Sequence, residues 1–180
     1  MFSGKTTELR RILSVYSSGK AKTLYVNSSK DTRSSDEFSS HDAQLKMPSS
    51  IMSIKVDKVA DLFVLSELKA YEVIGIDEAQ FYPDLFRSVM TLIEKHGKRM
   101  IVAGLTLDIK RDKFGFLSDL IPHADKCTKV YPYCSMCRDK NLFTEAIYTM
   151  LRYKKIQGNE QILIGGKETY IPVCRKCYMS

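Results

Sequence analysis

Gly4, Lys5 and Thr6, near the start of the chain, match the second half of a phosphate-binding loop, G-x-x-x-x-G-K-[ST]. In such a loop, backbone N–H groups cradle phosphates at the N-terminus of a helix, where the helix dipole favours negative charge. Lys5 would reach the terminal phosphates of a nucleotide, and the hydroxyl group of Thr6 would ligate Mg²⁺. Ser3 and Thr7 flank the tripeptide and belong to the same predicted site. The alternative is an ordinary helix start that is capped by Ser3.

Two adjacent acids, Asp77 and Glu78, follow the apolar run Val73–Ile76. A short apolar run that ends in acids is typical of a buried parallel strand whose carboxyl end meets an active site. Asp77 would hold Mg²⁺ opposite Thr6, directly or through water. Glu78 could accept a proton from an attacking hydroxyl group. The alternative is a pair of solvated carboxylates at a strand end.

Cysteines form the most specific spacing in the chain. Cys134 with Cys137 and Cys174 with Cys177 make two CxxC pairs, and four thiolates complete a tetrahedral Zn²⁺ site. Because four cysteines leave no open position on the metal, the predicted zinc is structural. Free or redox-active thiols are the alternative. We interpret Cys127 as a small buried residue and not as a fifth ligand.

The hydrophobic periodicity predicts the elements that would position these residues. We expect helices at Thr6–Ser18, Val59–Leu68 and Pro83–His96, and strands at Thr23–Val26, Ile51–Val56, Val73–Ile76, Met100–Ala103, Ala146–Leu151 and Gln161–Ile164. Strands that alternate with helices predict an α/β domain at residues 1–128, followed by a small ribbon-like zinc module at residues 129–180. The serine-rich stretch 27–50 is predicted to be a loop. Asp31 and Arg33, at its start, could join the metal and the phosphates, or belong only to a charged loop.

Composition sets wider bounds. The 180 residues have 44% hydrophobic content and a net charge of +7, which is ordinary for a globular protein and moderately basic. No stretch approaches the roughly 20 apolar residues of a membrane span. Together with metal-binding cysteine spacing, this predicts a cytoplasmic protein with no membrane partner.

Taken in order, the motifs resemble the thymidine kinase family that carries a zinc-binding lasso domain, the type found in vertebrate cytosol, many bacteria and poxviruses. The resemblance runs nearly end to end, through MFSGKTTELRR, KDTR with His41 and Asp42, VIGIDEAQFYPDL, Phe114 with Gly115, both CxxC pairs and IGGKETYIPVCRKCY. It implies an α/β core of RecA-like topology with a phosphate-binding loop and a parallel sheet, a C-terminal zinc-ribbon or lasso domain, and a homotetramer. The implied reaction phosphorylates thymidine on its 5′-hydroxyl with ATP and Mg²⁺, giving dTMP and ADP in pyrimidine deoxynucleotide salvage.

The resemblance also implies individual roles. Glu78 matches the general base, and the ATP and phosphate positions are matched by Ser3, Gly4, Lys5, Thr6, Thr7, Asp31, Arg33, Asp77 and Gln80. Thr6, Asp77 and Asp31 are the implied Mg²⁺ ligands. The positions around the nucleoside are matched by Met1, Phe81, Leu105, Ile109, Phe114, Ile162, Leu163, Ile164, Gly165 and Tyr170. Feedback by dTTP is a family feature that the sequence leaves open.

The sequence departs from the family pattern in two places. Ile109, within Thr106–Ile109, stands where the family has an aromatic contact to the substrate, so base stacking would be lost and nucleoside selectivity altered. The family's first strand and the Gly-Pro step before its phosphate loop are absent before Met1. We therefore expect the chain to be a fragment or a mis-started gene model. If it is complete, we expect a weakened core and poor ATP binding.

Two other classes of function fit part of the pattern. A nucleic-acid-dependent ATPase shares GKT and DEAQ, but helicases need two such core domains, and we expect no nucleic-acid partner. A zinc-ribbon binding module with a degenerate phosphate loop, catalytically weak or inactive, is the other alternative. Nucleic-acid affinity that falls steeply with salt would favour that module, whereas nucleoside-dependent ADP release would favour the kinase.

Overall fold

The computed structural model describes residues 2–31, 48–152 and 169–180, which belong to two compact units. The core unit comprises Lys5–Thr106 and Gly115–Asp125, and the cysteine unit comprises Met1–Gly4, Leu107–Phe114 and Lys126–Ser180. The cysteine unit thus gathers two short segments from before residue 128, and the predicted boundary at that residue stays a prediction. Several predicted features lie outside the described residues: Met1, Arg33, His41, Asp42, most of the serine-rich loop, the strand Gln161–Ile164 and Ile162–Gly165.

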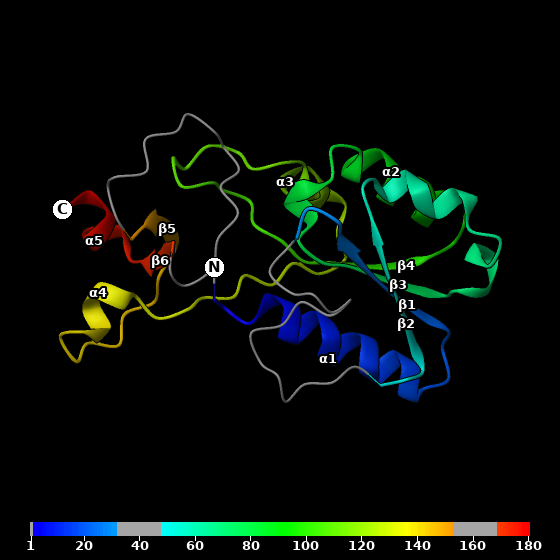
Figure 1. Cartoon of the computed structure of the whole chain (residues 1–180), viewed down its shortest axis with the longest axis horizontal. Coiled ribbons are helices and arrows are strands. Elements are labelled where there is room, and N and C mark those ends of the chain that lie inside the picture. The colour runs from blue at the N-terminus through cyan, green and yellow to red at the C-terminus, as the bar shows by residue number, and fades with distance from the viewer. Residues whose placement is uncertain (1, 32–47, 153–168) are drawn as a thin grey trace. The chain divides into compact units, whose positions relative to one another are not determined.

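A parallel four-stranded sheet forms the centre of the core unit, in the order β2 (Ile51–Val56), β1 (Thr23–Ser28), β3 (Val73–Ile76) and β4 (Arg99–Val102) (Figure 1). β1 is buried along its whole length, as is β3, because each has a neighbour on both sides and helices over both faces. The prediction of an α/β domain with a parallel sheet is confirmed. The carboxyl ends of the strands, where β3 ends at Ile76, lie at one edge of the sheet.

Helices cover the two faces of this sheet (Figure 1). α1 (Lys5–Ser18) packs Leu9 and Leu13 against Tyr25 of β1 on one face. On the other face, α2 (Leu85–Glu94) and the segment after β2 pack against Leu24 and Ile76. Because side chains alternate along a strand, odd-numbered residues of β1 and β3 face α1 and even-numbered ones face α2. The core unit therefore has three layers.

Gly75 allows α1 to lie close to the sheet. A Cβ atom at this position would be 2.5 Å from Cδ1 of Leu13, whose side chain is fully buried. Gly75 is paired in register with Tyr25, so both residues belong to the α1 face. The missing side chain thus sets the approach of the helix that begins at Lys5.

The segment predicted as a helix at Val59–Leu68 differs from expectation. It forms two 3₁₀ helices, η1 (Val59–Val64) and η2 (Leu68–Ala70). The first amides of η1 are held by another element: the carboxylate of Asp84 accepts from the N–H groups of Val59 at 3.1 Å and Ala60 at 2.7 Å. This external cap fixes the start of a tight turn, and the i→i+3 pattern continues to its end, where Leu65 N–H donates to Leu62.

Further short helices complete the core unit: η3 (Ala79–Phe81), directly after the acids, and α3 (Leu117–Leu120) with η4 (Ile121–His123). In the cysteine unit, β5 (Tyr148–Leu151) pairs antiparallel with β6 (Tyr170–Val173), and α4 (Ser135–Arg138) and α5 (Arg175–Met179) are single turns. β5 lies within the strand predicted at Ala146–Leu151. β6 was not predicted, since Pro172 interrupts the apolar pattern. Among the described residues, β5 and β6 pair only with each other, and a proline is tolerated on such an edge strand.

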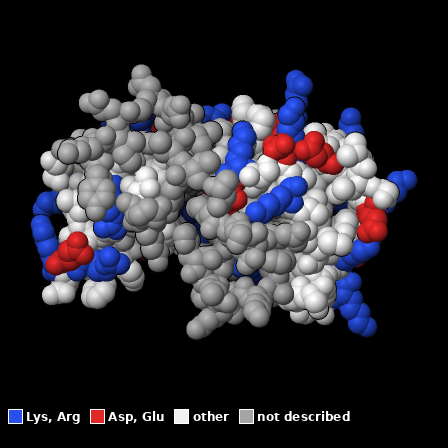
Figure 2. Space-filling view, viewed as in Figure 1, with Lys and Arg blue, Asp and Glu red and all other residues white. Residues whose placement is uncertain are grey.

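In the view of Figure 2, Lys and Arg side chains are scattered over the surface of the described residues, with Asp and Glu among them. Within the described residues, no helix has the length and apolar character to cross a membrane.

Candidate functional site

Asp77 lies at the carboxyl end of β3 and is 1% exposed. Its Oδ2 accepts a hydrogen bond from the hydroxyl group of Tyr25 at 2.8 Å, and its Oδ1 accepts from the N–H of Glu78 at 2.9 Å. The hydroxyl group of Thr6, in the first turn of α1, also hydrogen-bonds to this carboxylate. The structure therefore brings together Thr6 and Asp77, which the sequence predicts to share a metal ion.

Burial and the neighbouring charge of Glu78 raise the pKa of Asp77 to about 6, although the hydrogen bonds from Thr6, Tyr25 and the Glu78 amide oppose the rise. Keeping Asp77 ionised at neutral pH therefore costs free energy, and a bound cation would offset that cost. The donor set consists of a carboxylate and a hydroxyl group, which are hard oxygen ligands of the kind that Mg²⁺ prefers. These residues fit a magnesium ion.

Glu78 adopts a left-handed backbone conformation, with φ 47° and ψ 43°. A non-glycine residue in this region is uncommon and costs on the order of 1 kcal/mol, which surrounding contacts must offset. The turn redirects the chain from β3 into η3 and places two consecutive carboxylates at one strand end. Glu78 is 9% exposed, so the predicted alternative of solvated carboxylates is wrong for both acids.

Gln80 fixes the carboxylate of Glu78. Its Nε2 donates to Oε2 of Glu78 at 2.6 Å, while its Oε1 accepts from the N–H of Leu105 at 2.9 Å. The amide is 5% exposed, and the Leu105 donor determines which way it points. Gln80 therefore links the acid to the loop after β4, a function that was not predicted for it.

Two glycines make room for Gln80. A Cβ atom at Gly104 would be 2.8 Å from Oε1 of Gln80, and one at Gly115 would be 2.5 Å from its backbone oxygen. Gly115 also has φ +65°, which favours glycine. Backbone from two loops thus packs directly against the residue that holds Glu78.

Asp31, at the end of the first described segment, is 2% exposed and accepts a hydrogen bond from Nδ2 of Asn27 at 3.3 Å. Its backbone N–H donates to Ser28 at 3.0 Å, so the acid lies just beyond the carboxyl end of β1. β1 is the neighbour of β3 in the sheet. This places Asp31 at the same sheet edge as Asp77.

The phosphate-loop residues are divided between the two units. Lys5, Thr6 and Thr7 form the first turn of α1 in the core unit. Ser3 and Gly4 belong to the cysteine unit. Gly4 has φ +77°, and no atom of the described residues would lie within 4 Å of a Cβ placed there. The predicted helix after the loop is confirmed, and its first turn has the backbone N–H groups that an anion site needs.

The predicted nucleoside contacts are likewise divided. Leu105 and Phe81 belong to the core unit, whereas Ile109, Phe114 and Tyr170 belong to the cysteine unit. In the cysteine unit, the backbone oxygen of Ile109 accepts a hydrogen bond from the hydroxyl group of Tyr178 at 2.8 Å. Phe114 and Tyr170 are both buried. Their predicted contacts with a base stay predictions.

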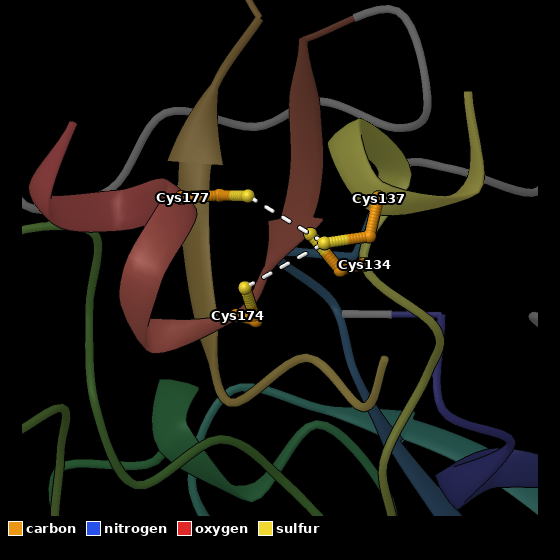
Figure 3. Close-up of side chains that lie close together, drawn as sticks. All are labelled: Cys134, Cys137, Cys174 and Cys177. Carbon is orange, nitrogen blue, oxygen red and sulfur yellow. Dashed lines mark hydrogen bonds between the residues drawn. The ribbon is translucent and has the colours of Figure 1, made fainter. Parts of the chain in front are cut away.

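The four paired cysteines converge in the cysteine unit (Figure 3). All four Sγ atoms lie within 4.8 Å of one another, and Sγ of Cys137 is 3.8 Å from that of Cys174 and 3.6 Å from that of Cys177. Four thiolates at about 2.3 Å from one tetrahedral zinc ion would be about 3.8 Å apart. The donor type and the sulfur spacing therefore fit zinc.

Each CxxC pair folds in the same way. Cys134 and Cys174 are the residues before α4 and α5, so the second cysteine of each pair lies one turn into the helix. A hydrogen bond from the backbone of Cys177 lowers the pKa of Cys174 to about 7, whereas hydrogen bonds to Cys174 and Cys137 raise the pKa of Cys177 to about 12. The four thiols therefore share their remaining protons, and a bound metal would replace those protons. Cys127 lies outside this cluster as predicted, but it is exposed and not buried, because its segment has no regular structure and packs into neither unit's core.

A family model described as thymidine kinase matches residues 1–178. The chain belongs to the thymidine kinase family. It is 39% identical to thymidine kinase a of Arabidopsis thaliana over 182 aligned residues, which cover 100% of the chain and 72% of that protein. It is 33% identical to the thymidine kinase of Bacteroides thetaiotaomicron, over 99% of the chain and 83% of that protein, and 35% identical to the cytosolic thymidine kinase of Bos taurus, over 99% and 68%.

As a member of this family, the chain carries its predicted motifs at defined places: Thr6, Asp77 and Glu78 around one sheet edge, and four cysteines in one cluster. Sequence reasoning did not identify Tyr25, which donates to Asp77, or Arg10, a buried residue of α1, as part of this site. The signal for Tyr25 was present, because strand alternation puts it on the same face as Asp77. Arg10 gave none, since an arginine on an amphipathic helix is usually a solvated residue.

Proposed function

We propose that the chain transfers the terminal phosphoryl group of ATP to the 5′-hydroxyl group of thymidine, giving dTMP and ADP in pyrimidine deoxynucleotide salvage. The observation that carries the proposal is the buried pair at the end of β3, in which Asp77 contacts Thr6 at the start of α1 while Glu78 is held by Gln80. Family membership supports the identity of the substrates.

In this proposal, Glu78 is the general base. It accepts the proton of the 5′-hydroxyl group as the oxygen attacks the phosphorus atom. Gln80 steadies the acceptor carboxylate through Oε2, so little reorganisation is needed when the substrate binds. The buried position excludes water, which would otherwise compete with the hydroxyl group as the nucleophile.

The remaining residues bind the nucleotide. Lys5 and the first-turn amides of α1 would contact its phosphates, and Thr6, Asp77 and Asp31 would hold Mg²⁺. The metal supplies charge neutralisation along the phosphates. Mg²⁺ binding would also offset the cost of keeping the buried Asp77 ionised. Ser3, Gly4, Thr7, Arg33 and Gln80 complete the proposed phosphate site.

We propose that the cysteine cluster binds one structural zinc ion and that the surrounding unit contacts the nucleoside through Ile109, Phe114 and Tyr170. Its sulfur spacing supports the zinc, and the family resemblance supports the nucleoside contacts. We also propose a cytoplasmic homotetramer with dTTP feedback, on the family resemblance alone. Light scattering of the purified protein would test the homotetramer, and ADP formation with added dTTP would test the feedback.

The decisive experiment measures ADP formation from ATP and Mg²⁺ with and without thymidine, for the chain and for Glu78→Gln. We expect thymidine-dependent turnover that falls by about 100-fold or more in the variant. Glu94→Gln is the matched control, since Glu94 is an exposed acid at the end of α2. No thymidine-dependent ADP from folded protein would contradict the proposal.

A further inference from the structure

Tyr25 is fully buried on the α1 face of the sheet and donates its hydroxyl proton to Oδ2 of Asp77 at 2.8 Å. A buried phenol is costly unless its hydroxyl group is hydrogen-bonded. A phenylalanine would fill the same space without that need. The tyrosine therefore contributes something beyond packing, and its hydrogen bond goes to the carboxylate that stands opposite Thr6.

Arg10 lies behind Tyr25. It is on α1, is 3% exposed, and its Cζ is 5.7 Å from the centre of the Tyr25 ring. Its guanidinium group also hydrogen-bonds to the Tyr25 hydroxyl group. The hydroxyl group accordingly accepts from a cation and donates to an anion, an arrangement in which each hydrogen bond strengthens the other.

The two oxygens of Asp77 are thus held from different directions. Tyr25 contacts Oδ2 from β1, and the backbone N–H of Glu78 contacts Oδ1 from the turn after β3. Together they fix the plane of the carboxylate. Outer residues that orient a metal-ligating carboxylate in this way control metal affinity as strongly as some direct ligands.

We propose that Tyr25 is a positioning residue for the phosphoryl transfer: its hydroxyl group, supported by Arg10, holds the Asp77 carboxylate in the orientation in which it takes Mg²⁺. The inference rests on the proposed function. It assigns Tyr25 and Arg10 no contact with ATP or thymidine.

The test compares Tyr25→Phe with the unchanged chain in two assays. In the first assay, Mn²⁺ replaces Mg²⁺ and is titrated into protein that contains a non-hydrolysable ATP analogue and no thymidine. Electron paramagnetic resonance measures the bound Mn²⁺. We expect Mn²⁺ to bind on the order of tenfold more weakly to the variant. The second measures ADP formation against Mg²⁺ concentration. The half-maximal Mg²⁺ concentration should rise by a similar factor, with the KM for thymidine unchanged and most of kcat recovered at saturating Mg²⁺.

Tyr16→Phe is the matched control, because the hydroxyl group of Tyr16, on α1, also contacts an arginine, Arg99, and among the described residues it has no carboxylate partner. It should leave both titrations unchanged. Arg10→Met should weaken Mn²⁺ binding in the same direction, by less, and it decides the question if Tyr25→Phe does not fold.

Unchanged Mn²⁺ affinity in folded Tyr25→Phe would overturn the inference, as would an equal effect in Tyr16→Phe. Failure of the proposed function looks different. The unchanged chain would then form no thymidine-dependent ADP, while the Mn²⁺ titration would still report whether Tyr25 positions Asp77.

Discussion

Replacing Asp77 with Asn should stabilise the metal-free protein at neutral pH. Asp77 is buried beside Glu78, and its pKa is raised from 3.8 to about 6. A group whose pKa is higher in the folded protein favours folding at low pH, and this contribution is lost as pH rises through the folded-state pKa. The shift of about 2 units corresponds to a cost of about 3 kcal/mol at pH 7.5, which an uncharged side chain would not carry.

The net gain is smaller because Asn cannot replace every hydrogen bond. The carboxylate accepts from the Tyr25 hydroxyl group, the Thr6 hydroxyl group and the Glu78 amide, whereas Asn has one oxygen acceptor and an NH₂ donor. One hydroxyl group must reverse its hydrogen bond, at a cost of about 1 kcal/mol. We therefore expect Asp77→Asn to raise the free energy of unfolding by about 2 kcal/mol, or the Tm by about 4–8 °C.

Urea denaturation in metal-free buffer at several pH values would measure this effect. The difference should be greatest above pH 6 and fall below about 1 kcal/mol at pH 5, because the native carboxyl group is then largely protonated in the folded state. Asp125→Asn, at an exposed acid of the same unit, should change stability by no more than about 0.5 kcal/mol. Mg²⁺ with ATP should stabilise the native chain and stabilise Asp77→Asn much less. Equal or lower stability of Asp77→Asn at pH 7.5 would refute the reasoning.

Three further predictions concern residues around this site and the cysteine cluster. Cys174→Ser, or a strong chelator, should remove one zinc ion per chain, as measured by mass spectrometry. Either change should abolish folding of the cysteine unit, because zinc binding contributes on the order of 10 kcal/mol to such modules. A zinc-free protein with unchanged amide exchange in β5 and β6 would contradict this prediction. Gly115→Ala should lower the free energy of unfolding by about 2–4 kcal/mol in chemical denaturation, since a Cβ would meet the Gln80 backbone. Gly97→Ala, at φ +61° but with open space among the described residues, should lower it by only about 1 kcal/mol. Gln80→Leu should lower thymidine-dependent kcat by up to about 100-fold, because Glu78 loses the donor that orients it. ATP binding, measured by calorimetry, should persist. An unchanged kcat would show that Gln80 does not orient Glu78.

The sequence predicted the parts of the fold that depend on local pattern. Apolar runs and helical spacing gave α1, β1 to β4 and the core of α2, since each of these elements buries a face whose period appears directly in the sequence. The cysteine cluster was predicted for a different reason. Metal ligands need fixed spacing within each pair, and CxxC states that spacing explicitly.

Features that depend on contacts between distant residues could not be predicted. The 3₁₀ form of Val59–Val64 depends on Asp84, a residue 24 or more positions away that caps its first amides. The function of Gln80 depends on Leu105 and on the space left by two glycines. In each case, the sequence shows an ordinary polar residue, and only the fold supplies its partner.

α1 connects these observations. Its first turn carries Lys5 and Thr6, and Arg10 follows one turn later, so a single helix presents both the proposed phosphate-binding residues and the proposed support for Tyr25. The position of this helix is set by Leu13 packing into the space that Gly75 leaves on β3, two residues before Asp77. The contact between Leu13 and Gly75 therefore contributes to the placement of α1, and with it of Thr6, beside Asp77. Because helix and strand share that contact, a shift of α1 would move the proposed metal ligands and their support together. The packing of an apolar side chain is therefore part of the geometry of the proposed site.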